Sequence, residues 1–383
     1  MARLKFWVWL SGVRNVPPLL KNHLCDVFGG PEAVYHAGRD ELMFEGATAK
    51  EAARLMDKSM AETERILSAC EAQSVDILTL QDAAYPERLR QIPDPPAVLY
   101  VRGRLPAVDE CACIAVVGTR HASAYGLQMA ANLGGEIAEG GGVVVSGLAE
   151  GCDGVAMEAA LRAGGAVIGV LGTSIDTVYP AKNRWLFREV VGRGALVSEH
   201  GPGVRTFSGD FKARNRIISG LSLGVAVAEA PVRSGTRVTV NRALEQARDV
   251  FAVPTAADGP NAEGYLALTR LGAVSVRNGA EILERYADRF ARYSPNFAPT
   301  PIKKEIDKLQ DMVYIDPQGP EPKWEELPED QRRILQAMDR PNMHADEIIE
   351  ATGLAAHKAL AALTMLQVSG YVTQSAGRRY TRK

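Results

Sequence analysis

Six short apolar segments recur through the middle of the chain, and longer amphipathic stretches separate them. Each segment is a run of Val, Ile, Ala and similar residues without polar alternation, which is typical of strands buried on both faces of a sheet. The stretches between them can cross back as helices, so the pattern predicts repeated βαβ units and a mostly parallel sheet. The predicted strands are residues 114–117, 143–145, 167–171, 195–197, 225–228 and 250–253.

The chain before this α/β core has a helical pattern. Residues 1–75 predict short helices, among them 19–28 and 49–60, and a Gly29-Gly30-Pro31 turn ends the first of these. Helix, glycine turn and helix is the outline of a SAM-like or helix-hairpin-helix module, and such modules often bind the DNA backbone through turn amides. This turn carries the acid Glu32 and no base, so a scaffolding role is equally open.

The chain after the core ends in a second small unit. Proline clusters predict a linker, and three helices with a β-hairpin follow it, which is the outline of a winged-helix domain. Its third helix, residues 356–368, is the candidate recognition helix for duplex DNA. A protein-docking module with a basic tail is the alternative. The boundaries we predict are 1–75 for the helical module, 76–292 for the core, 293–323 for the linker and 324–383 for the winged helix.

Small or basic turns follow the predicted core strands, where parallel sheets bind their ligands. Gly118-Thr119-Arg120, Ser146-Gly147 and the loop through Arg233, Ser234 and Gly235 are three of them. Glycine permits close backbone approach, and helix N-termini offer N–H groups to an anion. A single glycine turn more often means tight loop geometry, but several on one sheet edge beside arginines predict a phosphate-binding rim.

The charge distribution supports this interpretation. The chain of 383 residues has a formal net charge of −2, yet residues 205–248 contain eight Arg or Lys side chains against three acids. A basic patch on a chain of nearly balanced charge indicates a polyanionic ligand such as nucleic acid.

Several function classes lack their signatures. The chain has no G-x-G-x-x-G turn after the first strand and no P-loop, and neither His121 nor His200 lies near a nucleophile with an orienting acid. Asp153, Glu158 and Asp176 are as typical of helix caps or surface charges as of catalytic carboxylates. The five cysteines include no C-x-x-C pair, and no apolar run is long enough for a signal peptide or a membrane span. We therefore expect a soluble, cytoplasmic protein with no catalytic residues, no metal, no cofactor and no membrane partner.

Four segments resemble the DprA/Smf family of bacterial DNA-processing proteins. They are Ala115-Val-Val-Gly-Thr-Arg120, Ser146-Gly-Leu-Ala-Glu-Gly-Cys-Asp-Gly154, Gly169-Val-Leu-Gly-Thr-Ser-Ile-Asp-Thr-Val-Tyr-Pro-Ala-Lys-Asn183 and Arg214-Asn-Arg-Ile-Ile-Ser-Gly-Leu-Ser222. The resemblance implies an extended Rossmann-like core, with a helical module before it and a winged helix after it. It also implies a homodimer that binds single-stranded DNA in natural transformation and loads the recombinase RecA onto the strand.

The resemblance assigns a DNA-binding role to particular residues. Arg120 becomes a phosphate ligand, and residues 211–216, which include Phe211, Lys212, Arg214, Asn215 and Arg216, become the wall of the DNA pocket. Arginine forks suit phosphate, an aromatic face suits a base, and the amides of Ser146-Gly147 and Ser234-Gly235 could cradle phosphate oxygens.

This chain departs from the family pattern around the pocket. The family usually has a basic residue shortly before the phenylalanine, whereas Ser208-Gly209-Asp210 stands here, so Arg205 or Lys212 would have to replace it. The loop Ser234-Gly-Thr-Arg-Val-Thr239 and the residue Thr255 also differ from the usual sequence. These differences bear on the pocket and leave the expected fold unchanged.

Two other functions remain open at this stage. A nucleotide phosphoribohydrolase on the same type of sheet would carry a Pro-Gly-Gly-x-Gly-Thr loop closely followed by glutamate, and Pro231-Val-Arg-Ser-Gly-Thr236 with Glu245 is a partial match. A winged-helix transcription regulator with a sensing core is the other alternative.

The arginines of the 211–222 segment are expected to differ in role. Arg214 and Arg216 are two positions apart on a predicted helix, about 200° around its axis, so both cannot face one groove. We expect one of them to face the DNA, and Arg216 to pair internally with Glu199 or Glu229. Arg120 should project from the carboxyl edge of the sheet toward an anion.

Overall fold

The computed structural model divides the chain into two units, Met1–Ile315 and Asp316–Lys383, each considered by itself. The residues that it describes are 3–256, 258, 259, 261–290, 313, 314, 327–338, 340, 343–368, 371–375 and 379–382. Most of the predicted linker, and residues 376–378 within the predicted terminal hairpin, lie outside these residues.

A nine-stranded sheet forms the centre of the first unit, in the order β1-β2-β7-β5-β4-β3-β8-β9-β10. The strands from β7 to β10 are parallel, and the β1–β2 and β2–β7 pairs are antiparallel. All six predicted core strands are present, within one or two residues of the predicted ends. Their bounds are β3 Cys113–Val117, β4 Val143–Ser146, β5 Val167–Leu171, β7 Gly194–Ser198, β8 Gly224–Val227 and β9 Asp249–Ala252.

The remaining strands extend the sheet at both ends. β1 Asp76–Thr79 and β2 Val98–Gly103 precede the six predicted strands in the chain, and β10 Val274–Ser275 follows them. From β3 the chain first builds β4, β5 and β7 on one side, then returns to place β8, β9 and β10 on the other. The strand order therefore reverses between β3 and β8, which is where open α/β sheets hold their ligands. The mostly parallel α/β fold is confirmed.

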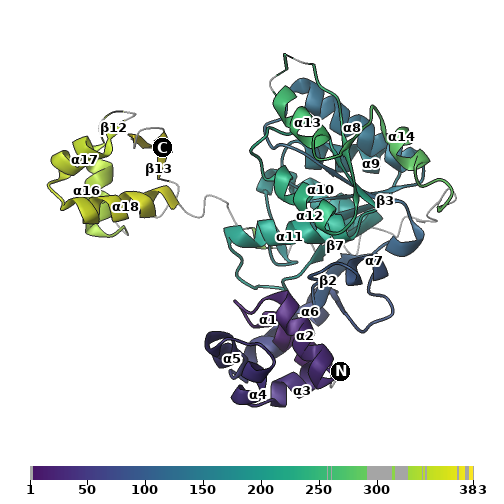
Figure 1. Cartoon of the computed structure of the whole chain (residues 1–383), viewed down its shortest axis with the longest axis horizontal. Coiled ribbons are helices and arrows are strands. Elements are labelled where there is room, and N and C mark those ends of the chain that lie inside the picture. The colour runs from purple at the N-terminus through teal and green to yellow at the C-terminus, as the bar shows by residue number, and fades with distance from the viewer. Residues whose placement is uncertain are drawn as a thin grey trace. The chain divides into compact units, whose positions relative to one another are not determined.

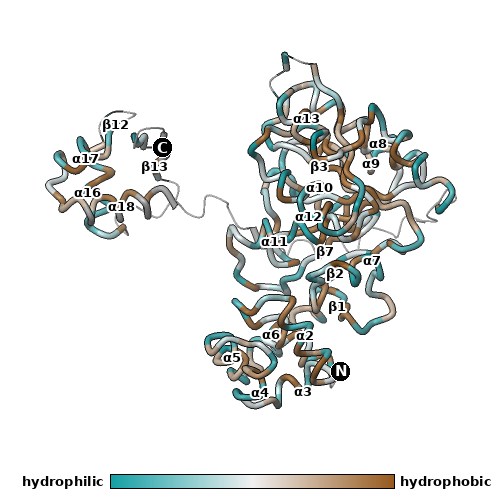
Figure 2. Tube along the Cα trace, in the orientation of Figure 1, coloured by the Kyte–Doolittle hydropathy of each residue, from teal (hydrophilic) through white to brown (hydrophobic). Residues whose placement is uncertain are grey.

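Helices cover both faces of the sheet (Figure 1). Alternate residues of β3 contribute to different apolar clusters, Ile114 and Val116 to one and Ala115 and Val117 to the other. The first cluster includes buried residues of α8 Ala124–Glu139, α9 Cys152–Arg162 and α10 Arg184–Arg193, and the second includes those of α11 Ser208–Gly220 and α12 Thr236–Glu245. Hydrophobic segments accordingly concentrate in the sheet, and hydrophilic ones lie at the periphery (Figure 2).

Short helices complete the first unit. They are α1 Leu4–Gly12, α2 Pro18–Phe28, α3 Pro31–His36, α4 Arg39–Phe44, α5 Ala49–Leu55, α6 Ala61–Gln73, α7 Glu87–Arg90, α13 Ala262–Thr269 and α14 Gly279–Glu284. The predicted helix 49–60 is shorter, because α5 ends at Leu55 and α6 begins at Ala61. The predicted glycine turn separates α2 from α3, with Gly29 and Gly30 at positive φ.

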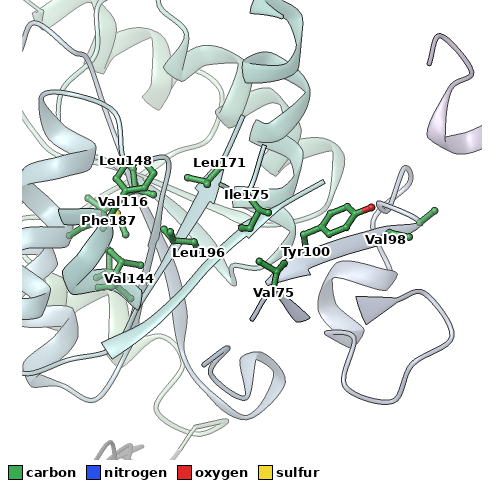
Figure 3. Close-up of a cluster of buried hydrophobic side chains, with 14 of the residues drawn as sticks. Val75, Val98, Tyr100, Val116, Val144, Leu148, Leu171, Ile175, Phe187 and Leu196 are labelled. Carbon is green, nitrogen blue, oxygen red and sulfur yellow. The ribbon is translucent and has the colours of Figure 1, made fainter. Parts of the chain in front are cut away.

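The N-terminal helices share their core with the sheet. The apolar residues 6–10, which open the chain like a short signal sequence, are all buried within α1. A single apolar cluster continues from Trp7 and Trp9 through Val75 and Tyr100 to Val116 beneath the parallel strands. Figure 3 shows the part of this cluster from Val75 and Tyr100 to the sheet. The helical module therefore does not form a separate core.

The described residues of the second unit form three helices and a three-stranded sheet. The helices α16 Glu329–Ala337, α17 Ala345–Thr352 and α18 Ala356–Val368 confirm the predicted helical order. The hairpin strands are β13 Val372–Ser375 and β14 Arg379–Arg382, and β12 Met343–His344 adds an antiparallel third strand that the sequence pattern did not reveal. Within the first unit, β11 Val313–Tyr314, two residues of the predicted linker, pairs in parallel with β6 Thr177–Val178. Across the described parts of the chain, no helix is long and apolar enough to cross a membrane.

Candidate nucleic-acid interface

The turns at the carboxyl edge of the sheet are closely packed against one another. The Thr119 N–H donates to the carbonyl oxygen of Glu229 (2.8 Å), which joins the ends of β3 and β8 at the point where the strand order reverses. A Cβ atom on Gly118 would lie 2.4 Å from Cys152 Sγ, so this glycine makes room for α9 rather than for a ligand. The crevice at the reversal point is therefore filled by the protein's own atoms.

The Asp153 carboxylate accepts hydrogen bonds from backbone N–H groups in two of the turns that were predicted to bind phosphate. The N–H of Gly147 donates to Asp153 Oδ2 (3.1 Å) and that of Gly118 to Oδ1 (3.3 Å), while Ser146 Oγ donates to the Val116 carbonyl oxygen (2.7 Å). Burial raises the pKa of Asp153, and Arg214 and these hydrogen bonds oppose the rise. In this structure a buried carboxylate of the chain accepts the Gly147 N–H and Ser146 is fully buried, so the phosphate-binding role of this turn stays a prediction that would require these hydrogen bonds to change.

The Glu229 carboxylate occupies the N-terminus of α8, another place where an anion could bind. Its carboxylate accepts the backbone N–H of Ser123 (2.7 Å) and the Ser123 hydroxyl (2.9 Å), and Ser123 Oγ in turn caps Gly126 (3.1 Å). Glu229 is buried, and a Cβ on Gly126 would lie 2.1 Å from its Oε2. The donors that would hold a nucleotide phosphate here are bound to the protein's own carboxylate.

The helix α11 presents an aromatic pair at the same edge. The ring of Phe211, which is half-buried, lies 5.0 Å from that of Tyr179, centroid to centroid, in a tilted arrangement. A Cβ on Gly172, directly after β5, would lie 2.8 Å from Phe211 Cδ1 and 2.9 Å from its Cα. Gly172 therefore permits the close approach of α11 that brings Phe211 to the end of β5.

Arg214, three residues after Phe211 on α11, is buried. Its Nη1 donates to the carbonyl oxygens of Gly147 (3.0 Å) and Val170, at the ends of β4 and β5. Burial lowers the pKa of the guanidinium to about 10, Asp153 opposes this, and the charge of Arg120 adds to it. Arg214 is 8% exposed. Arg214 therefore does not lie on the exposed surface, because its donors bind strand-end carbonyl groups, and the expectation that one arginine of the pair faces the DNA stays a prediction.

Arg216 forms the predicted internal pair with Glu199. Its Nη1 and Nη2 donate to Glu199 Oε2 (2.8 Å) and Oε1 (2.7 Å), and its Nε donates to the carbonyl oxygen of Asp94 (2.8 Å). Burial alone would raise the pKa of Glu199, but the charge and hydrogen bonds of Arg216 together hold it below its usual value. The guanidinium is 2% exposed, so Arg216 belongs to the internal support of α11 and not to the DNA-facing surface.

Four other predicted cations lie on the surface. Arg120, Arg205, Lys212 and Arg233 are exposed, and none of them forms a salt bridge with a described carboxylate. We call these four residues the basic rim. Arg120 follows β3 and Lys212 lies on α11, and the effect of the Arg120 charge on Arg214 indicates that it lies close to that helix.

The other predicted site residues lie at the same edge but differ in exposure. Asn215 is half-buried, and its Oδ1 accepts from Arg214 Nε (3.2 Å). Ser234 and Gly235 immediately precede α12. Gly235 is exposed, whereas the Ser234 hydroxyl is buried without a hydrogen-bond partner among the described residues.

Two residues at this edge were not among the predicted site residues. Tyr179 lies within a family motif, so its contact with Phe211 had a signal in the sequence. Phe207 lies directly before α11 and is 50% exposed, and Arg14 from the α1–α2 loop contacts its ring. No sequence pattern connects residues 14 and 207, because only the folded chain brings them together.

The larger cavities lie elsewhere and carry acids. One, of about 670 Å³, is lined by Glu136, Glu139, Glu281 and Glu284, and another, of about 860 Å³, lies beside β1 and β2 and is lined by Asp76, Asp109 and Glu110. Neither charge pattern suits a polyanion. Within the described residues, no group of three or more His, Cys, Asp or Glu side chains is arranged to hold a metal ion.

Known proteins resemble both units of the chain. Residues 76–287 match the family DNA recombination-mediator protein A, and residues 318–378 match the DprA winged helix domain. Protein Smf of Synechocystis is 31% identical over 402 residues, covering 99% of this chain and 98% of the relative.

Two solved structures are also similar. The X-ray structure of DNA processing protein A from Streptococcus pneumoniae has a TM-score of 0.64 and 30% identity, and the match covers 73% of this chain and 97% of that one. DNA processing protein A from Helicobacter pylori, a structure described for its single-stranded DNA binding mode, has a TM-score of 0.51 and 28% identity, over 57% of this chain and 99% of that one. The family matches, the relative that spans nearly the whole chain and the shared fold lead to one conclusion: this chain belongs to the DprA/Smf family of DNA-processing and recombination-mediator proteins.

Proposed function

We propose that this protein binds single-stranded DNA along the basic rim and around Phe211. The observation that carries the proposal is the pairing of an aromatic contact, Phe211 with Tyr179, with exposed cations that have no carboxylate partner among the described residues. Exposed bases stack on aromatic rings, and cations beside them neutralise the phosphates, which is the usual arrangement for sequence-independent binding of single strands. The solved Helicobacter pylori relative supports the choice of ligand.

The internal carboxylates support a binding role over a catalytic one. Asp153 and Glu229 accept hydrogen bonds from backbone N–H groups that could otherwise donate to a nucleotide phosphate, and both carboxylates are buried. Glu245, the acid of the partial phosphoribohydrolase match, lies at the far end of α12 from its loop and pairs with Arg242 (2.8 Å). Ten residues of helix span about 15 Å. That separation keeps Glu245 from assisting chemistry at the loop.

The finer role follows the family. We propose that the protein acts as a homodimer, protects incoming single strands during natural transformation and loads RecA onto them; the family name of a recombination mediator supports the last of these roles. The test is strand exchange by RecA on DNA precoated with single-strand-binding protein. Addition of this protein should shorten the lag before strand exchange begins, and an unchanged lag would contradict the loading role.

The winged-helix unit is proposed to contact duplex DNA through α18. The family match at residues 318–378 and the basic residues near the chain end support this assignment. A fragment of residues 316–383, whose buried side chains form their own apolar cluster, should retard a duplex oligonucleotide. If it binds no duplex at low salt, the unit is a protein-docking module.

The test of the main proposal is a mobility shift with single-stranded and duplex oligonucleotides of the same length, across a salt series. The full chain should prefer the single strand irrespective of its sequence. Equal affinity for both forms, or preference for one duplex sequence, would favour a transcription regulator instead.

A further inference from the structure

An exposed phenylalanine precedes α11 and is contacted by two arginines. The side chain of Phe207 is 50% exposed, and the guanidinium carbons of Arg14 and Arg205 lie 4.9 Å and 5.4 Å from its ring centroid. The two arginines are also linked to each other, because Arg14 Nη2 donates a hydrogen bond to the Arg205 carbonyl oxygen. We call Arg14, Arg205 and Phe207 the arginine–phenylalanine cluster.

The cluster joins two parts of the first unit that are far apart in sequence. Arg14 lies between α1 and α2, whereas Arg205 and Phe207 belong to the loop that leads into α11. The same loop has a second contact with the N-terminal helices, because Arg65 Nη2 on α6 donates to the carbonyl oxygen of Pro202 (2.9 Å). In Figure 1, α11 accordingly lies directly above α1. Two contacts from the N-terminal helices therefore hold the loop in place.

The position of Phe207 does not depend on what its ring contacts. Its backbone N–H donates to Asp210 Oδ2 (2.7 Å), and its carbonyl oxygen accepts the Asp210 N–H (3.0 Å), so the start of α11 fixes the residue. Neither Arg14 nor Arg205 forms a salt bridge with a carboxylate in the described residues. A fixed, half-exposed ring next to two uncompensated cations has the chemistry of a nucleotide contact: a π surface for the base and guanidinium groups for the phosphates.

We propose that the arginine–phenylalanine cluster is a second stacking site for single-stranded nucleic acid, which continues the path of the strand from Phe211 toward the N-terminal helices. This rests on the proposed function. Phe207 directly precedes α11 and lies four positions before Phe211, which corresponds to ~6 Å along the helix axis. A base stacks on an aromatic ring more strongly than an exposed guanidinium does, so the base displaces an arginine from the ring. The displaced guanidinium then contacts the flanking phosphate.

A purely structural role for the cluster predicts different behaviour. If Phe207 only anchors Arg14 and the N-terminal helices, any apolar side chain of similar size should serve. If it stacks on a base, an aromatic ring is required, and the effect depends on the presence of that base.

The test uses the full chain with three variants at one position and a matched control. Phe207→Ala should weaken binding of a single-stranded oligonucleotide about tenfold or more, Phe207→Leu should weaken it similarly, and Phe207→Tyr should bind within about twofold of wild type. Phe44→Ala removes another exposed phenylalanine (87% exposed), at the end of α4, and should bind as wild type. All four should bind an abasic oligonucleotide of the same length with the wild-type affinity for it.

Two results would overturn the inference while leaving the proposed function intact. One is a Phe207→Leu protein with wild-type affinity, and the other is an equal loss for Phe207→Ala on the abasic and the intact strand. A wild-type protein that binds no single strand would instead contradict the proposed function itself.

Discussion

The carboxyl edge of the sheet has two layers of positive charge that the sequence alone presents as one patch. In the inner layer, Arg214 and Arg216 are buried and bind carbonyl groups or Glu199. In the outer layer, the basic rim is exposed and has no carboxylate partner in the described residues. Buried charges need partners to offset desolvation, whereas exposed ones keep their water until a ligand replaces it. The inner layer therefore supports the helix, and the outer layer is available to DNA.

The largest expected effect is a loss of folding stability when an arginine of the inner layer is removed. Arg216→Ala leaves the half-buried carboxylate of Glu199 without its bidentate partner, and because breaking a fully buried pair costs about 3–5 kcal/mol, we expect a loss of up to about this size. Urea denaturation should show a loss of this size. The matched control is Lys212→Ala, an exposed cation on the same helix, which should unfold as wild type and bind single strands more weakly. Equal stability of Arg216→Ala and wild type would remove the distinction between the layers.

The second prediction concerns the outer layer. Arg120→Ala should weaken single-strand binding at least about tenfold, which corresponds to ~1.4 kcal/mol, because a guanidinium–phosphate contact is lost. The melting temperature should stay close to that of wild type, since Arg120 is exposed and has no described carboxylate partner. Thermal denaturation and fluorescence anisotropy on the same preparations would reveal either a stability loss or an unchanged affinity, and each would contradict the assignment.

The third prediction is a pH dependence of the inner layer. The pKa of Glu199 is below its usual value of 4.5 in the folded protein, so the pair contributes stability above pH 4.5 and loses it as the pH falls through the folded-state pKa. The stability difference between wild type and Glu199→Gln should therefore be largest near neutral pH and shrink below about pH 4.5. Urea titrations of both proteins from pH 7 to the acid limit of folding would measure it. A difference that stayed constant or grew with acid would show that Glu199 is not the group stabilised by Arg216.

The smallest effect is expected from removing the second unit. A chain ending at Ile315 keeps both apolar clusters of the sheet and the whole basic rim. Its affinity for short single strands should lie within about threefold of that of the full chain, a change of less than ~0.7 kcal/mol. Loss of binding in a truncated protein that remains folded would assign the single-strand site to the winged helix.

Hydrophobic periodicity was sufficient to predict the parallel strands and their order along the chain, because a strand buried on both faces has a distinctive apolar run. The phase of the α11 helix also indicated that Arg214 and Arg216 could not face one groove, and the Arg216–Glu199 pair followed from it. The sequence could not reveal that Asp153 accepts the turn amides, because a glycine turn has the same sequence whether a phosphate or a carboxylate binds it. The approach of Arg14 to Phe207 depends on a tertiary contact between the α1–α2 loop and the loop before α11, which leaves no local pattern.

The central claim is that exposed cations of the rim neutralise DNA phosphates. Its most direct test is the salt dependence of single-strand affinity for wild type, Arg120→Ala and Lys212→Ala. The logarithm of the wild-type association constant should fall linearly with the logarithm of salt concentration, by about 0.7 per phosphate contacted. Each variant should reduce that slope by about 0.7. Identical slopes for the three proteins, or an affinity independent of salt, would contradict the account.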